Sequence, residues 1–126
     1  MTILLIDSDK LLAKNVATAF ARTGHKLVHI TQAEAAIDFI DKHPPQAIIL
    51  DLQLAGRSGV EFLFEFKSYP EWAQIPIIIF SSLPNAEAKR YLDSFSKLDI
   101  KGYFYKPATA LGQLVEAVNQ LAPQPV

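Results

Sequence analysis

The sequence predicts an α/β protein with one doubly wound sheet of five parallel strands and helices on both faces. Two observations support this fold class. Short apolar runs of strand length alternate along the whole chain with segments whose apolar residues recur every three to four positions, as in helices. Parallel strands need long crossover connections, and each gap between the apolar runs is long enough to hold one. Right-handed crossovers then place helices on both faces of the sheet.

Length and composition fit a single domain. The chain has 126 residues, of which 50% are hydrophobic and 20% charged, and a chain of this size buries roughly two thirds of its unfolded surface. Its apolar runs are far shorter than the ~20 residues of a membrane span. The formal net charge is -1, with no basic block that would bind nucleic acid directly. Without cysteines or a signal-peptide pattern, we expect a soluble, cytoplasmic protein.

Proline and apolar runs define the predicted strands. Pro44 and Pro45 end the preceding helix and introduce the third strand, because a helix does not continue through proline. Pro76 is compatible only with the start of the fourth strand, and Pro107 follows the fifth. The five strands are predicted at residues 3–6, 26–30, 46–52, 75–80 and 102–106.

Helical spacing of apolar residues predicts the connections. Leu12, Val16 and Phe20 recur four residues apart, and Gly24 stands just past that helix, where a C-cap glycine is typical. Thr31 is expected to cap the second helix. The other predicted apolar faces are Ala33, Ala36, Ile37 and Ile40; Ala88, Tyr91, Leu92, Phe95 and Leu98 of a helix over 85–98; and Leu111, Leu114, Val115, Val118 and Leu121.

The segment 60–66 has an ambiguous period. Its apolar side chains alternate from Val60 to Phe66 like those of a strand, yet Val60, Leu63 and Phe64 also share a helical face. We predict a helix, because the strands on either side need a crossover there. The segment holds one phenylalanine too many for one helical face, and an exposed one would indicate a partner surface.

Polar residues follow four of the strands at one edge of the predicted sheet. Asp7, Asp51, Ser81 and Lys106 stand at the ends of strands one, three, four and five, and ligands bind at the carboxyl ends of strands in open α/β sheets. Two carboxylates 4 Å apart repel by ~4 kcal/mol at an effective dielectric of ~20, so a divalent cation and Lys106 are expected to neutralise them. Oxygen ligands suit Mg²⁺. An aspartate in this position can act as a nucleophile toward a phosphoryl group.

These residues, in this order and on these elements, resemble the receiver domain of bacterial two-component response regulators over essentially the whole chain. The resemblance implies a flavodoxin-like (βα)5 fold with strand order 2-1-3-4-5, a receiver domain at 1–122 and a tail at 123–126. The matching features are the acidic turn Asp7-Ser8-Asp9, Asp51 at the end of its apolar strand, Gly56, Gly59, Ser81 and the run Gly102-Tyr103-Phe104-Tyr105-Lys106-Pro107.

The resemblance implies a role for each matching residue. Asp51 is similar to the phosphoacceptor, and Asp7 to the acid that helps bind Mg²⁺ through water. Ser81 is similar to the hydroxyl that hydrogen-bonds the phosphoryl group, and Lys106 to its counter-ion. Tyr103 is similar to the aromatic residue that switches rotamer, and the bond before Pro107 is typically cis in the family.

The metal site departs from the family pattern. The resemblance implies Asp7, Asp51 and the backbone carbonyl of Gln53 as ligands, with Ser8 or Asp9 left open as a further one. In the family the position of Ser8 carries a carboxylate that touches Mg²⁺ directly, and a neutral hydroxyl is a poorer ligand for a small hard cation. We therefore expect weak Mg²⁺ binding.

The stretch between Ser81 and Lys106 is also longer than usual, so the fourth helix or the following loop is expected to differ.

The resemblance implies a signalling function rather than an enzyme, apart from self-phosphorylation by small donors and autodephosphorylation. The chain would accept a phosphoryl group on Asp51 from a histidine kinase or phosphotransfer protein, and would switch an output-protein face made of the fourth helix, fifth strand and fifth helix. The kinase, the output partner and a homodimer are left open. One alternative is a pseudo-receiver that signals by protein contact without phosphorylation. A remote one is a haloacid-dehalogenase-like phosphatase with Asp7 as nucleophile and Asp9 as general acid.

Overall fold

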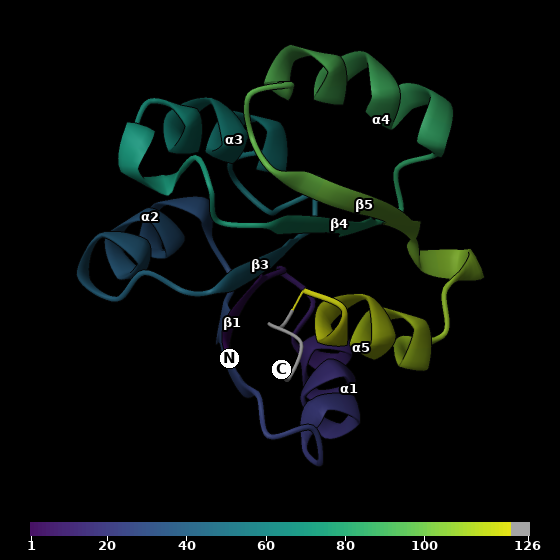
Figure 1. Cartoon of the computed structure of the whole chain (residues 1–126). Coiled ribbons are helices and arrows are strands. Elements are labelled where there is room, and N and C mark those ends of the chain that lie inside the picture. The colour runs from purple at the N-terminus through teal and green to yellow at the C-terminus, as the bar shows by residue number, and fades with distance from the viewer. Residues whose placement is uncertain (122–126) are drawn as a thin grey trace.

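The computed structural model describes residues 1–121, so the expected tail at 123–126 lies outside the described residues. The described chain forms a parallel sheet of five strands in the order β2-β1-β3-β4-β5 (Figure 1). This confirms the predicted fold class and strand order. The strands are β1 (Thr2–Ile6), β2 (Lys26–Ile30), β3 (Ala47–Leu50), β4 (Ile77–Ser81) and β5 (Ile100–Tyr105).

Helices cover both faces of this sheet. Helices α1 and α5 pack on one face, and α2, α3 and α4 pack on the other (Figure 1). None of the helices within residues 1–121 is long and apolar enough to span a membrane. The α-helices are α1 (Lys10–Phe20), α2 (Ala33–Lys42), α3 (Gly59–Lys67), α4 (Asn85–Leu92) and α5 (Leu111–Asn119), and the 3-10 turns are η1 (Pro70–Trp72), η2 (Asp93–Phe95) and η3 (Lys106–Ala108).

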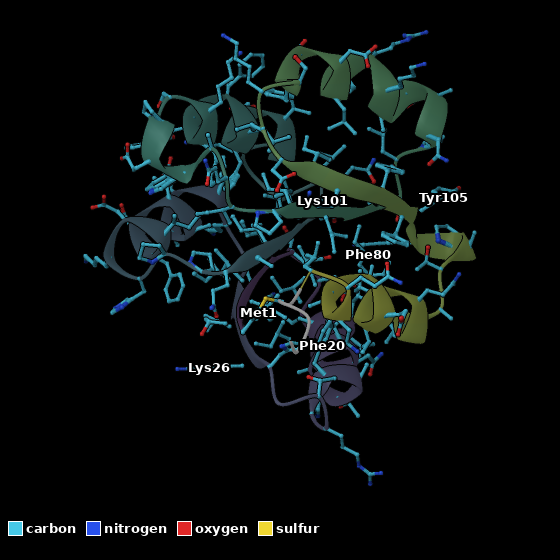
Figure 2. All side chains as sticks on the ribbon, in the orientation of Figure 1. Met1, Phe20, Lys26, Phe80, Lys101 and Tyr105 are labelled. Carbon is cyan, nitrogen blue, oxygen red and sulfur yellow. The ribbon has the colours of Figure 1, made fainter. Side chains whose placement is uncertain are left out.

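The sheet separates two apolar cores. Side chains alternate along each strand, so Leu4 and Ile6 of β1 point toward α2, α3 and α4, whereas Ile3 faces α1 and α5. Figure 2 shows Phe20 and Phe80 on the side of α1 and α5, and both are buried in that core. Burial on both faces explains why the central strands are apolar throughout.

The segment 60–66 is helical, as predicted. Ser58 caps α3 by accepting a hydrogen bond from the backbone N–H of Glu61 at 3.1 Å. Phe62 and Phe66 are fully buried, whereas 54% of Phe64 is exposed. The surplus phenylalanine of this segment therefore lies at the surface.

The region after β4 differs from the prediction. The predicted helix over 85–98 ends as an α-helix at Leu92 and tightens into η2. Phe95 is buried in the core as predicted, whereas Tyr91, also predicted to face inward, lies on α4 before the tighter turn and is 47% exposed. The sequence predicted a departure from the family pattern in the stretch between Ser81 and Lys106.

Three local predictions were wrong. Thr31 does not cap α2: Gln32 holds the N-cap position without a side-chain hydrogen bond, and the carbonyl of Thr31 accepts a bond from Ser8 instead. Strand β5 begins at Ile100, before a register irregularity opposite Ile77 and Ile78, and ends before Lys106. The peptide bond between Lys106 and Pro107 is trans, not cis.

Candidate functional site

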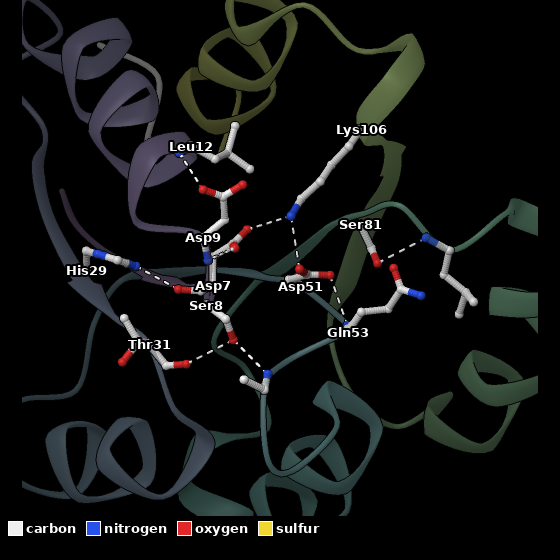
Figure 3. Close-up of polar contacts among 12 residues, drawn as sticks. Asp7, Ser8, Asp9, Leu12, His29, Thr31, Asp51, Gln53, Ser81 and Lys106 are labelled. Carbon is white, nitrogen blue, oxygen red and sulfur yellow. Dashed lines mark hydrogen bonds and ion pairs between the residues drawn. The ribbon is translucent and has the colours of Figure 1, made fainter.

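Two buried carboxylates meet at the carboxyl edge of the sheet. Strands β1 and β3 are neighbours, with Ile6 opposite Leu50, so Asp7 and Asp51 leave the sheet side by side (Figure 3). Only 1% of Asp7 and 5% of Asp51 is exposed. Burial of two acids in contact is unfavourable without a compensating positive charge.

Lys106 supplies that charge. Its Nζ lies 2.8 Å from Oδ2 of Asp7 and 2.9 Å from Oδ2 of Asp51. Burial lowers the pKa of Lys106, but the hydrogen bonds to the two carboxylates more than offset this, and its pKa is raised above the ordinary 10.5. Nζ also lies 5.7 Å from the ring centroid of Phe80, close enough for a cation–π contact. Lys106 is therefore a cation shared by both acids.

Backbone amides hold the other oxygen of each carboxylate. The N–H of Asp9 donates to Oδ1 of Asp7 at 2.8 Å, and the N–H of Gln53 donates to Oδ1 of Asp51 at 3.0 Å. Each bond spans two residues, which is the pattern of an Asx turn. The two turns fix the orientation of the carboxylates, and the second places the backbone of Gln53 beside Asp51.

Glycine at position 59 allows α3 to start against the end of β3. A Cβ atom on Gly59 would clash with the backbone carbonyl oxygen of Asp51 and lie 2.6 Å from Cα of Leu52. The N–H of Gly59 donates to the carbonyl of Leu52 at 2.9 Å. In the loop between them, Gly56 has φ +83°, which favours glycine. The backbone that carries Asp51 thus depends on two glycines.

Ser8 connects loops. Its hydroxyl donates to the carbonyl of Thr31 at 3.3 Å and accepts from the N–H of Ala55 at 2.7 Å (Figure 3). The turn after β1 is thereby linked to the loop after β2 and to the loop after β3. Both the proton and a lone pair of the hydroxyl are used in these contacts.

Asp9 also has a structural contact. Its Oδ1 accepts a hydrogen bond from the N–H of Leu12 at 3.0 Å and caps α1. A bond that the sequence reasoning missed joins Nε2 of His29 to the carbonyl of Asp7 at 2.7 Å. The register of β2 against β1 could have indicated this bond, because His29 lies opposite Leu5, two residues before Asp7.

Ser81 and Tyr103 meet at Leu83. Ser81 is fully buried at the end of β4, and its Oγ accepts from the N–H of Leu83 at 3.3 Å. The phenol of Tyr103 donates to the carbonyl of Leu83. Burial raises the pKa of Tyr103 above 10.0, so the phenol stays protonated and able to donate near neutral pH. One residue therefore connects the two side chains.

The oxygen atoms at this edge suit a hard cation. Carboxylates and carbonyls are the protein ligands of Mg²⁺, which keeps several waters and needs few protein groups. Asp7, Asp51 and the carbonyl of Gln53 offer the oxygen types of such a donor set. Within residues 1–121, however, no three histidine or acidic side chains gather as a metal-binding group. The residues fit a magnesium ion held by few anionic ligands.

Comparison with known families identifies the chain. A family model described as the response regulator receiver domain matches residues 3–119. The chain belongs to this family. Because the match covers nearly the whole chain, we set aside the phosphatase alternative, whose general acid would be Asp9, a side chain that caps α1 here.

Curated relatives of this receiver are longer proteins. It is 26% identical over 122 residues to the gliding motility regulatory protein of Myxococcus xanthus, covering 96% of this chain and 15% of that protein. It is 33% identical over 67 residues to the transcriptional regulatory protein QseB of Escherichia coli O157:H7, covering 53% of this chain and 31% of that protein. The receiver thus corresponds to less than a third of each.

Solved structures agree on the fold. The receiver domain of the Francisella response regulator 1452 superposes with a TM-score of 0.81 at 23% identity, covering 95% of this receiver and 94% of that chain. The phosphorylated cyanobacterial phytochrome response regulator RcpA superposes with a TM-score of 0.77 at 25% identity, covering 95% and 89%. Both likenesses support the observed fold.

Proposed function

We propose that this receiver accepts a phosphoryl group on Asp51 from a phosphohistidine of a kinase or phosphotransfer protein, or from a small donor such as acetyl phosphate. The observation that carries the proposal is the contact of Lys106 with Asp51 at 2.9 Å. It places a permanent cation beside the one acid at the end of central strand β3. The net charge of -1 favours protein partners over nucleic acid.

The chemistry is a phosphoryl transfer between two nucleophiles. A carboxylate oxygen of Asp51 attacks phosphorus, the P–N bond of the donor breaks, and its electron pair returns to the imidazole, which takes a proton from solvent. Lys106 balances charge on the phosphoryl oxygens. The hydroxyl of Ser81 accepts from Leu83 and keeps its own proton to donate to a phosphoryl oxygen. Mg²⁺ bound by Asp7, Asp51 and the Gln53 carbonyl supplies further positive charge.

Phosphorylation would be communicated through Leu83 to the face formed by α4, β5 and α5. Drawing Ser81 toward a phosphoryl group shifts Leu83, and this changes the acceptor of the Tyr103 phenol. Two packings of Tyr103 that differ by a few kcal/mol are enough for a switch that phosphorylation biases. An output protein that contacts this face reads the change.

Mass spectrometry tests the phosphoacceptor. After incubation with acetyl phosphate and Mg²⁺, we expect an adduct of about 80 daltons that is lost in Asp51→Asn. Amide chemical shifts with and without beryllofluoride test the switch, and changes should reach residues 85–121. An adduct that persists in Asp51→Asn would refute the assignment of Asp51. Shift changes confined to the loops around Asp7 and Asp51 would refute the switch.

A second candidate function is a phosphorylation-independent receiver that acts by protein contact. One feature favours it: Ser8, which stands where the family carries a metal-binding carboxylate, uses its hydroxyl to join loops. No adduct with either kind of donor, together with an output interaction that Asp51→Asn leaves unchanged, would support this function over phosphotransfer.

A further inference from the structure

A groove lies on the face of the sheet that carries α2, α3 and α4. It runs between the end of α3 with η1 and the segment from η2 to Leu98, and has a volume of about 510 Å³. We name it the α3–η2 groove. In Figure 1, α3 and α4 lie above the sheet and α5 below it. None of the residues that line the groove belongs to α4, β5 or α5, so the groove is distinct from the face that those three elements form. The residues that line the groove include Lys67, Pro70, Ala73, Phe95, Lys97 and Leu98.

The exposed Phe64 stands beside this groove. Its ring meets the ring of Phe95, which lines the groove, edge to face at a centroid distance of 4.9 Å. Nζ of Lys67 lies 5.5 Å from the Phe64 centroid and 5.6 Å from the Phe95 centroid. With 54% of Phe64 exposed, the groove and this ring form one apolar surface below an ammonium group.

The charged side chains that line the groove are all positive. Lys67 and Lys97 line it, and none of the residues that line it is acidic, although the chain as a whole has a net charge of -1. Pro70, Ala73 and Leu98 contribute apolar surface between the two lysines. A surface of this kind complements a segment that carries an apolar anchor flanked by carboxylates.

We propose that the α3–η2 groove docks an acidic segment of a partner protein, with apolar side chains against Phe64 and Phe95 and carboxylates against Lys67 and Lys97. The charge complementarity selects this occupant, since a second copy of the groove would present like charges. The interaction requires neither Asp51 nor a phosphoryl group. It therefore provides a second attachment surface besides the proposed output face.

The only tryptophan of the chain can report occupancy. Trp72 stacks on Tyr69 with ring centroids 4.0 Å apart and is buried behind the groove. Its chain neighbour Ala73 lines the groove, as does Pro70 at the start of the same turn. A ligand in the groove changes the surroundings of Trp72, so its fluorescence should respond.

The test uses a synthetic peptide in which glutamate alternates with leucine and phenylalanine. We expect saturable quenching or a shift of Trp72 emission, lost at high salt. Lys67→Glu with Lys97→Glu should weaken binding about tenfold or more, because two ion pairs become repulsive contacts. The same double variant should bind a peptide with lysine in place of glutamate. Phe64→Ser should weaken binding of the glutamate peptide to the native chain and of the lysine peptide to the double variant.

Matched controls make the result decisive. The control variant Lys14→Glu with Lys26→Glu makes the same change in net charge, but on α1 and β2. Lys26 points away from the fold in Figure 2. This variant should bind the peptide with unchanged affinity. Equal binding of a glutamine peptide, or equal weakening by the control variant, would overturn the proposal. Self-association that Phe64→Ser abolishes would identify a second copy as the occupant and also overturn it. Acetyl phosphate labelling of the same variants measures phosphorylation of Asp51 independently. A failure of the groove to bind the peptide is thereby distinguished from a failure of Asp51 to accept a phosphoryl group.

Discussion

The two halves of the site use their side chains differently. In the half proposed to bind the phosphoryl group, called the phosphoryl half, Asp51, Ser81 and Lys106 each place a functional group at the carboxyl edge of the sheet. In the half proposed to bind Mg²⁺, called the metal half, Asp7 does the same, but Ser8 joins two loops and Asp9 caps α1. Within the acidic turn, Ser8 and Asp9 therefore use their side chains for contacts with the backbone, whereas Asp7 contacts both the backbone of Asp9 and Lys106.

Lys106 is the element that both halves share. One cation contacts two carboxylates, so these three side chains retain one net negative charge when both acids are ionised. That charge is enough to attract a cation but is smaller than a site with three acids would carry.

Removing Lys106 should have the largest effect on stability. In Lys106→Met the buried acids lose their shared cation, and breaking a buried ion pair costs about 3 kcal/mol or more of unfolding free energy. Urea unfolding at neutral pH measures this loss. The double variant Asp7→Asn with Lys106→Met should recover part of the loss, because one of the two unpaired charges is removed. If the native chain and Lys106→Met had equal stability, the contacts of Lys106 with Asp7 and Asp51 would not contribute to folding stability.

Gly59→Ala should disturb the phosphoryl half alone. Its Cβ would meet the backbone of Asp51 and Leu52, and the cost of such overpacking is about 1–3 kcal/mol. Gly112→Ala is the matched control, because no atom lies within 4 Å of a Cβ there. We expect urea unfolding to show the loss for Gly59→Ala only. A loss of the same size at both positions would indicate a general helix effect rather than contact with β3.

Ser8→Ala should disturb the metal half alone. It removes the partner of the Ala55 N–H and of the Thr31 carbonyl, at a cost of about 1–2 kcal/mol. Thr18→Ala, which deletes an exposed hydroxyl on α1, should change stability by less than about 0.5 kcal/mol. Thermal unfolding distinguishes the two. Faster amide exchange of Ala55 in Ser8→Ala alone would be the local signature, and unchanged exchange would contradict the loop contact.

Alkaline pH should produce the smallest effect. The folded pKa values of Lys106 and Tyr103 are raised above 10.5 and 10.0. Their contributions are therefore complete below about pH 10 and are lost as pH rises through the folded values. Tyr103→Phe should lower stability at pH 7 by about 0.5–1.5 kcal/mol and make the alkaline decline shallower. A steeper decline in Tyr103→Phe would contradict the raised pKa of the phenol.

Much of the fold could be predicted because it depends on local pattern. Apolar runs located all five strands and helical spacing located four of the helices, while the need for a crossover between parallel strands identified α3. The exact ends could not be predicted in the same way. The early end of α4 at Leu92 depends on how Phe95 reaches the core, and the start of β5 at Ile100 depends on its pairing with β4. Both are tertiary effects.

The functional site likewise has features that the sequence could predict and features that it could not. The residues at the strand ends were predictable, because the carboxyl ends of parallel strands share one edge. The contacts of Ser8 with Thr31 and Ala55 were not, since they join loops that are distant in sequence. The same holds for the contact of His29 with the Asp7 carbonyl, which depends on strand register.

The most direct test of this account measures the rate of acetyl phosphate labelling of Asp51 against Mg²⁺ concentration, in the native chain and in Ser8→Asp. A carboxylate at position 8 still accepts from Ala55 and adds an anionic ligand. The account predicts labelling of both chains, with half-saturation of the native chain at a Mg²⁺ concentration roughly tenfold higher. Labelling of the native chain at an equal or lower Mg²⁺ concentration than Ser8→Asp would contradict it.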